Sequence, residues 1–353
     1  MPVPPNRPFP GRGTPAPRRR GPGRLAVTPD LLAALAGRLT ARDRWLLRMI
    51  WEHRVLTTSQ ITQLAFGTTR AATARLFTLY QHQVIDRFRP LAVTGSAPWH
   101  FVLGPAGAQV LAGEDAITPA QLGYRRDRAL AIAVSPRLAH ATGTNAFFTT
   151  LAACARRTPG ASLACWWSER RCAALWGDLA RPDGYGRWRE PAGRAEAEFF
   201  LEYDTGTEDL PRLVAKLTGY RMLAARTAIT TPVLFWLQSP RREAALHARL
   251  ASSGSGGGMV AAVPVATSTS TPALAGDDGP AGAVWLPAGR AGARLRLAQI
   301  PAAWPAITTA APPPAGAADA APPATGLPWH PPAPAPPPAP RYREPGAGHP
   351  GRW

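Results

Sequence analysis

The chain has 353 residues, of which 40 are basic and 22 are acidic, so its formal net charge is +18. No apolar run reaches the roughly 18 residues that cross a bilayer, and the first residues lack the apolar stretch of a signal peptide. We therefore expect a cytoplasmic protein that makes no membrane contact. The positive charge predicts a polyanionic partner, of which nucleic acid is the most general. The alternative explanation is the arginine bias of a GC-rich genome.

Several chemistries find no support in the sequence. Cys154, Cys165 and Cys172 form no CxxC pair and have no paired histidines nearby, which argues against a zinc site and against a disulfide framework. The chain also has no Walker loop and no GxGxxG motif, so a nucleotide cofactor is not expected.

Composition divides the chain into five parts. Residues 1–27 are rich in Pro, Gly and Arg and predict a disordered basic tail. Residues 301–353 are mostly Pro and Ala and predict an extended, disordered tail. Between them lie two regions with regular periodicity, 28–115 and 138–300, which the segment 116–137 joins as a linker.

The first region begins with three predicted helices. Thr40 can cap a helix that runs to about His53, with apolar residues on one face. Thr57 or Thr58 can cap a short second helix. After a tight turn at Gly67, a third helix covers residues 70–80.

Two alternating stretches, Val84–Phe88 and Trp99–Leu103, then predict a pair of strands around a Gly/Pro/Ser turn. Helix, short helix, turn, helix and hairpin together indicate a winged helix-turn-helix that binds double-stranded DNA. A helical protein–protein module is the alternative. The expected DNA contacts lie on the outer face of the third helix and on the wing: Arg70, Thr73, Arg75, Arg87 and Arg89.

The second region alternates between helix-like and strand-like stretches, which predicts an α/β domain. The predicted helices are Ala139–Arg156, Leu210–Ala224 and Arg241–Leu250. The predicted strands are Ser162–Ser168, Glu198–Asp204, Val233–Gln238 and Met259–Val265.

Three acids and one lysine are the candidate site of this region. Glu202 and Asp204 lie on one face of their strand, and Asp183 can converge on them from the end of the adjoining strand. Carboxylate oxygens suit Mg²⁺, which can activate water for phosphodiester hydrolysis. Lys216 is the single lysine of the chain, and it offers a compact positive charge that arginine cannot replace. The alternative is that this lysine survives by chance and has no role in a site.

We expect structural roles for two polar residues near this candidate site. His140 stands at the start of a predicted helix and is assigned to capping or to the core, with catalysis as the alternative. Glu208 is expected to cap the helix that begins near Leu210 rather than to bind a metal.

The order of helices, strands and acids resembles the PD-(D/E)xK restriction-endonuclease core. In that pattern a lysine follows the acid by two residues, where this chain has Asp204, so Lys216 would have to supply the charge from the next helix. The resemblance implies Asp183, Glu202 and Asp204 as metal ligands and all four residues as catalytic, with Mg²⁺ as the cofactor of an active enzyme.

Residues 39–245 resemble the replication-relaxation family of plasmids and integrative elements. The similarity lies in LTARDRWLLRMIWEHRVLTTSQI, HATGTNAFFTTL, SER and PDG…FFLEYDTGTE…KLTGY. It implies a DNA-binding accessory protein of plasmid replication or conjugative mobilisation, with replication or transfer proteins as partners. The alternatives are an active Mg²⁺-dependent endonuclease or nickase and a winged-helix transcriptional regulator.

Overall fold

The computed structural model of the protein describes residues 27–91, 95–191, 196–253, 263–271, 276–290, 292–305, 307 and 331–337. The described residues form a mixed α+β structure with two sheets. The predicted tail 1–27 lies almost entirely outside the described residues, as does most of the predicted tail 301–353. None of the described helices combines the length and apolarity needed to span a bilayer.

The N-terminal region contains five helices and three short strands among the described residues. In chain order they are α1 Pro29–Arg38, α2 Ala41–His53, β1 Leu56–Thr57, α3 Thr58–Ala65, α4 Thr69–Gln81, β2 Ile85–Phe88, β3 His100–Leu103 and α5 Pro105–Glu114. The strands form an antiparallel sheet in the order β1-β3-β2.

Local capping explains where these helices begin. The Thr40 side chain accepts from the backbone N–H of Asp43, and the Asp43 carboxylate accepts from that of Thr40. Thr57 and Gln60 make the same reciprocal arrangement at α3. Each of these capping boxes satisfies backbone N–H donors that have no partner within the helix. The predicted starts of α2 and α3 are therefore confirmed.

The second region, which we call the sheet region, follows two short helical segments, α6 Arg126–Ala131 and η1 Ile132–Val134. Its elements are α7 Leu138–Arg157, β4 Ser162–Ser168, α8 Glu169–Trp176, β5 Gly184–Arg189, β6 Ala197–Tyr203, α9 Leu210–Thr227, β7 Val233–Leu237, α10 Pro240–Ser253, β8 Val265–Thr269, η2 Gly279–Ala281, β9 Leu286–Pro287, η3 Leu297–Gln299 and α12 Ile300–Ala303. The strand order is β4 to β9 in sequence, antiparallel except for the β6-β7 and β7-β8 pairs, which are parallel.

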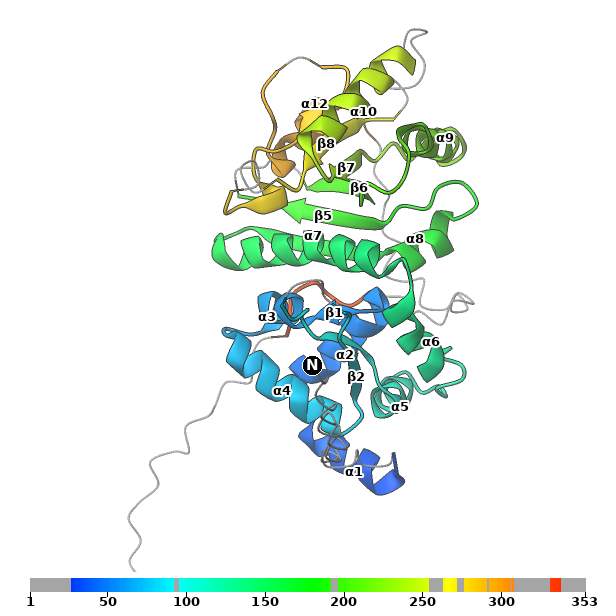
Figure 1. Ribbon diagram of the computed structural model, residues 1–353, viewed down its shortest axis with the longest axis vertical. Helices are drawn as coiled ribbons and strands as arrows, with labels where there is room; N and C mark the ends of the chain where they lie inside the picture. The colour runs from blue at the N-terminus through cyan, green and yellow to red at the C-terminus, as the bar shows by residue number, and fades with distance from the viewer. Residues whose placement is uncertain are drawn as a thin grey trace, which may run out of the picture.

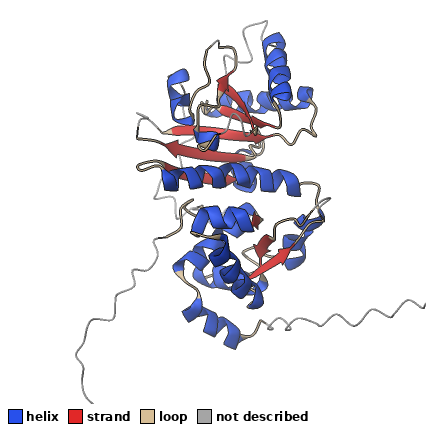
Figure 2. Cartoon of the chain, turned by 60° about the vertical axis from the view of Figure 1, so that its left-hand side comes forward, coloured by secondary structure: helices blue, strands red, loops and turns tan. Residues whose placement is uncertain are grey.

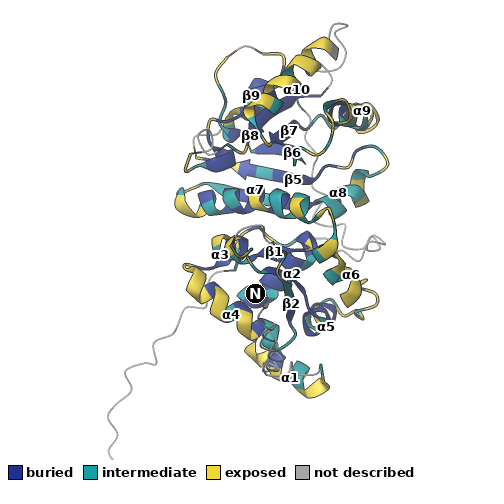
Figure 3. Cartoon of the chain, in the orientation of Figure 1, coloured by how far each residue is buried: buried dark blue, intermediate teal, exposed yellow. Residues whose placement is uncertain are grey.

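Helices cover both faces of this sheet (Figures 1 and 2). Side chains alternate between the faces of a strand. In β6, Phe199 and Leu201 therefore pack with α7, whereas Phe200 packs with Leu213 and Leu217 of α9. Glu202 consequently lies on the α9 face, and Figure 3 shows the strands as the most buried layer of the region.

Three local predictions need correction. Residues 184–189 were not among the predicted strands, because the sequence GYGRWR of β5 contains two glycines, which are depleted in strands. Gly186 is needed there because a Cβ would meet the Phe199 ring at 2.4 Å. Helix α8 was missed, although Ser168 caps it. The strand predicted at Met259–Val265 begins only at Val265, and residues 254–262 lie outside the described part.

The two regions pack closely. The Glu52 carboxylate of α2 accepts from Arg171 and Ser168 of the sheet region, and both members of the ion pair are almost fully buried. Asn145 of α7 donates to the carbonyl oxygen of Val55 at 2.7 Å. One apolar core extends through both regions. The relative position of the regions is therefore fixed by directional bonds as well as by apolar packing.

A short proline-rich segment near the C-terminus, residues 331–337, returns to the N-terminal region (red in Figure 1). Trp45 of α2 donates its indole N–H to the carbonyl oxygen of Ala333 at 2.7 Å, and Pro334 is buried. This segment supplies the acceptor that a buried tryptophan needs.

Candidate functional site

Glu202 is the centre of a buried polar cluster at the end of β6. It is 1% exposed and accepts from the ammonium of Lys216 at 2.8 Å and from the hydroxyl of Tyr220 at 2.5 Å. Both donors project from α9, and they share one helix face because they are four residues apart. This spacing could have identified Tyr220 from the sequence.

Lys216 points toward the acids, as expected for a residue of this site. Its ammonium also lies 3.2 Å from a carboxylate oxygen of Glu208. The prediction that Glu208 caps α9 is wrong, because Asp209 is the capping residue and accepts from the N–H of Arg212. Glu208 is thereby left to join the cluster.

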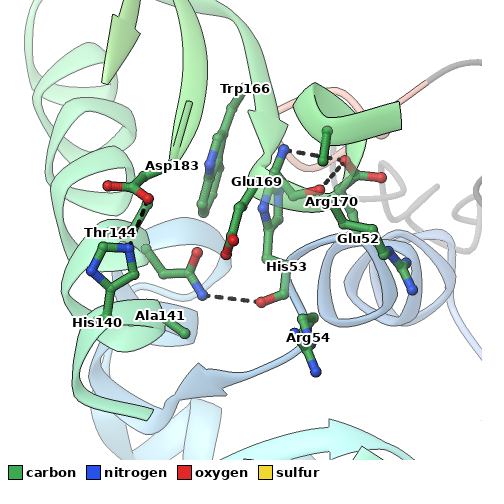
Figure 4. A pocket seen from close by; sticks show the side chains of 13 residues that line it. Glu52, His53, Arg54, His140, Ala141, Thr144, Trp166, Glu169, Arg170 and Asp183 are labelled. Atoms are coloured by element: carbon green, nitrogen blue, oxygen red, sulfur yellow. Dashed lines mark hydrogen bonds and ion pairs between the residues drawn. The ribbon is translucent and has the colours of Figure 1, made fainter. Parts of the chain in front are cut away.

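Asp183 stands at the start of β5 beside the Glu202 strand. Its carboxylate accepts from the backbone N–H of Tyr203 at 2.8 Å. It also contacts Nε2 of His140 at 2.9 Å, as Figure 4 shows. His140 therefore does more than cap or pack: it brings α7 to the acid cluster. The alternation of residues along β6, on which the acidic cluster was predicted, does not indicate that His140 contacts Asp183.

Asp204 is held separately from this cluster. Arg242 of α10 donates to both of its carboxylate oxygens, and the N–H of Gly206 donates at 3.0 Å. Its side chain is fully buried. Nothing in the local sequence predicts Arg242 as the partner, because the two residues are 38 positions apart.

The acids do not form an open metal site in this conformation. Among the described residues, no group of three His, Cys, Asp or Glu side chains is arranged to hold a metal ion. Glu202 is occupied by Lys216, and Asp204 by Arg242. Mg²⁺ would have to compete with these donors for the carboxylate oxygens, so we derive no metal-dependent step from this arrangement.

The protonation of the cluster reflects its burial. Burial and the neighbouring charge of Asp183 raise the pKa of Glu202 to about 7, against the opposing influence of Lys216. Burial lowers the pKa of Lys216, but Glu202 and Asp183 outweigh it and raise that pKa. The pKa of His140 is lowered by burial and raised more strongly by Asp183. Near neutral pH, Lys216 is charged while Glu202 is close to titration.

The five predicted DNA contacts fall into three groups. Arg70 and Thr73 are exposed on the outer face of α4. Arg75 was expected to face outward, but its Nε donates to the buried carboxylate of Asp43 at 2.9 Å. Because that carboxylate lies at the capped start of α2, the Arg75 side chain links α4 to α2.

Arg87 and Arg89 lie over aromatic rings of the hairpin region. The Arg87 guanidinium carbon is 4.1 Å from the ring centre of Trp99 and 4.3 Å from that of Tyr80. That of Arg89 is 4.3 Å from the same tryptophan. Stacking orients a guanidinium while leaving its N–H groups available at the ring's edge.

A family model described as replication-relaxation matches residues 47–234. The chain belongs to the replication-relaxation family. The match runs from within α2 to the start of β7 and therefore includes helices α3 to α5 of the N-terminal region and the Glu202 cluster. No curated protein and no solved structure matches the chain.

Proposed function

We propose that this replication-relaxation protein is a DNA-binding accessory protein of plasmid replication or conjugative mobilisation. The N-terminal region would hold double-stranded DNA as a winged helix-turn-helix, and the sheet region would be a variant of the restriction-endonuclease-like fold. The observation that carries the proposal is the position of exposed Arg70 and Thr73 on α4, next to a hairpin with two stacked arginines.

The N-terminal arrangement supports this use. Helices α3 and α4 follow each other across a short turn, and the β2-β3 hairpin comes directly after α4. In helix-turn-helix proteins the second helix enters the major groove. Helix α4 presents exposed Arg70 and Thr73 for that purpose, and Arg89 is exposed on the hairpin side.

The sheet region supports the nuclease-like part of the proposal by its topology. Helix α7 is followed by the antiparallel strands β4, β5 and β6, then by α9 and the parallel strand β7. Asp183 precedes the second of these strands, and Glu202 lies in the third. This is the order in which the PD-(D/E)xK core carries its acids.

Titration of a fluorescent duplex with the full chain tests the DNA-binding proposal. We expect the double substitution Arg70→Ala/Arg89→Ala to weaken binding by about tenfold at low salt. The slope of log affinity against log salt should decrease by about 1.8, since each lost phosphate contact removes about 0.9.

Arg241→Ala/Arg249→Ala is the matched control, because it removes two exposed charges from α10. This control should bind the duplex like the unchanged chain. Equal affinity of all three proteins would contradict the assignment of α4 and the hairpin to DNA.

A metal-dependent endonuclease or nickase is the second candidate, favoured by the contact of Lys216 with Glu202 beside Asp183. Mg²⁺ is proposed as its cofactor. Asp183, Glu202 and Asp204 would hold the ion, in competition with the donors Lys216 and Arg242. Supercoiled plasmid incubated with the chain and Mg²⁺ or Mn²⁺ would then be nicked or linearised, whereas the accessory role leaves it supercoiled.

Substitutions of Lys216 would sharpen that result. Lys216→Ala should abolish cleavage and leave duplex binding unchanged. Lys216→Arg should restore little, because a planar guanidinium cannot occupy the position of the ammonium. Cleavage that survives Lys216→Ala would remove this residue from the reaction.

A further inference from the structure

The junction between the two regions contains a pocket of about 220 Å³ whose polar groups are not all satisfied by the protein. The buried groups without a hydrogen-bond partner in its lining are both ring nitrogens of His53, the hydroxyl of Thr144 and Nε of Arg170. Figure 4 shows the pocket between α7 and the end of α2. These atoms are themselves almost wholly inaccessible and do not reach the open space, so the indication of a ligand comes from the arginines that line the neighbouring pocket.

A second pocket of about 470 Å³ adjoins the first, since Arg54 and Arg170 line both. It adds Arg125 and Arg128, and no acidic side chain lines it. Arg125 pairs with the exposed Asp127 at 2.7 Å. Four guanidinium groups around one space favour an anion with several acceptor oxygens, and phosphate fits this description.

The geometry also indicates which part of a nucleic acid fits. Trp166 cannot stack on a base, because the His53 ring covers it at 3.7 Å and Phe148 covers it at 5.1 Å. The two pocket volumes are close to those of small-ligand pockets, about 300–1,000 Å³. Pockets of this size are too narrow to hold a duplex. The pockets can therefore contact the backbone of one strand.

The two pockets lead toward the acids. Three acids, Glu52, Glu169 and Asp183, line the first pocket together with His140, and the charge of Asp183 raises the pKa of Glu202. Helix α6, which contributes Arg128, lies on the opposite side of the N-terminal region from α4 in Figure 1. A strand in these pockets would thus be separate from a duplex bound at α4.

We propose that the two junction pockets bind the phosphodiester backbone of a single DNA strand and lead it to Asp183. Arg54 and Arg170 contact phosphates at the passage between the pockets, and Arg128 contacts the strand outside it. The inference rests on the proposed function in DNA binding, and it adds a strand-specific, sequence-independent site to the duplex site.

Fluorescence anisotropy with the full chain in EDTA tests this site, using a labelled single-stranded 15-mer and the corresponding duplex. The test variant is Arg54→Gly/Arg128→Ala, with glycine chosen because the φ of Arg54 is 68°. We expect the affinity for the single strand to fall about tenfold and its salt slope to decrease by about 1.4, which is 0.7 for each phosphate contact. Duplex affinity should stay within about twofold.

Four controls make the result specific. Arg241→Ala/Arg249→Ala should leave single-strand binding unchanged, and Arg70→Ala/Arg89→Ala should weaken duplex binding alone. Arg54→Lys/Arg128→Lys should recover most of the single-strand affinity, because the charges are kept. A deoxynucleoside monophosphate at the same phosphate concentration should displace the 15-mer only weakly.

Four outcomes would overturn the inference. Equal losses for duplex and single strand would make the arginines part of one duplex surface. Full displacement by the monophosphate would indicate a small-phosphate site instead of a strand site. An unchanged single-strand affinity in the test variant would remove the junction site but leave duplex binding, and with it the proposed function, intact. Failure of the unchanged chain to bind either DNA would refute both proposals.

Discussion

Asp43 in the N-terminal region and Glu202 in the sheet region are equally buried, each 1% exposed, yet their pKa values move in opposite directions. Burial raises both. At Asp43, hydrogen bonds from Arg75 and Thr40 outweigh burial and lower the pKa. At Glu202, the charge of Asp183 adds to burial and raises the pKa to about 7. The hydrogen bonds to Asp43 more than offset its burial, so its charged form stabilises the fold. Glu202 keeps an unfavourable interaction with the charge of Asp183, and a perturbed pKa of this kind is typical of functional sites.

The largest expected effect tests whether the two regions depend on each other. Arg171→Leu leaves the buried Glu52 carboxylate without its guanidinium partner, and such a change costs about 3–5 kcal/mol of the free energy of unfolding. Urea denaturation of both proteins measures this loss. Glu52→Leu/Arg171→Leu should recover much of it, and a loss below about 1 kcal/mol would show that the ion pair does not fix the junction.

The dependence of stability on pH sharpens the comparison of the two acids. Since the folded pKa of Glu202 lies near 7 and its ordinary value is 4.5, the folded state holds the proton longer than the unfolded state does. The free energy of unfolding should therefore fall by about 1–3 kcal/mol as pH rises from 4.5 to above 7. Urea titrations at pH 5 and pH 8 measure this fall.

Glu202→Gln should remove most of the fall, because glutamine cannot ionise. If the variant keeps the full decrease between pH 5 and pH 8, another group is responsible and the contrast between Glu202 and Asp43 is lost.

Asp43 should give the opposite pH dependence. Because its folded pKa is lowered from 3.8, its stabilisation is present above about pH 4 and is lost as pH falls through the folded value. Asp43→Asn should cost about 2 kcal/mol at pH 7, since it weakens the bonds to Arg75 and Thr40. The difference from the unchanged chain should become smaller below pH 4 in urea titrations.

The smallest effect concerns the proline-rich segment on α2. Trp45→Phe removes the donor to Ala333 and should lower the free energy of unfolding by about 1 kcal/mol in the full chain. In a chain that ends at residue 330, the same substitution should cost less, because the acceptor is already gone. Equal costs in both chains would mean that the segment does not contribute through this bond.

The sequence alone determined the features that depend on neighbours along the chain. The starts of α2 and α3 follow from Thr40 and Thr57, whose partners are three residues away. Strand β4 has the predicted limits, because its short apolar run SLACWWS contains two tryptophans, and aromatic residues favour strands. The family resemblance was confirmed over residues 47–234, while the winged-helix and nuclease-like assignments remain proposals.

The tertiary structure decided which partner each polar side chain takes. Asp204 and Glu202 look equivalent in the sequence, yet Arg242 binds the first and Lys216 the second. Arg75 has the spacing of an outward residue but turns to Asp43. His53 and Thr144 lie in one pocket although 91 positions separate them. Pairing over such distances depends on how helices pack against the sheet, and no local pattern encodes it.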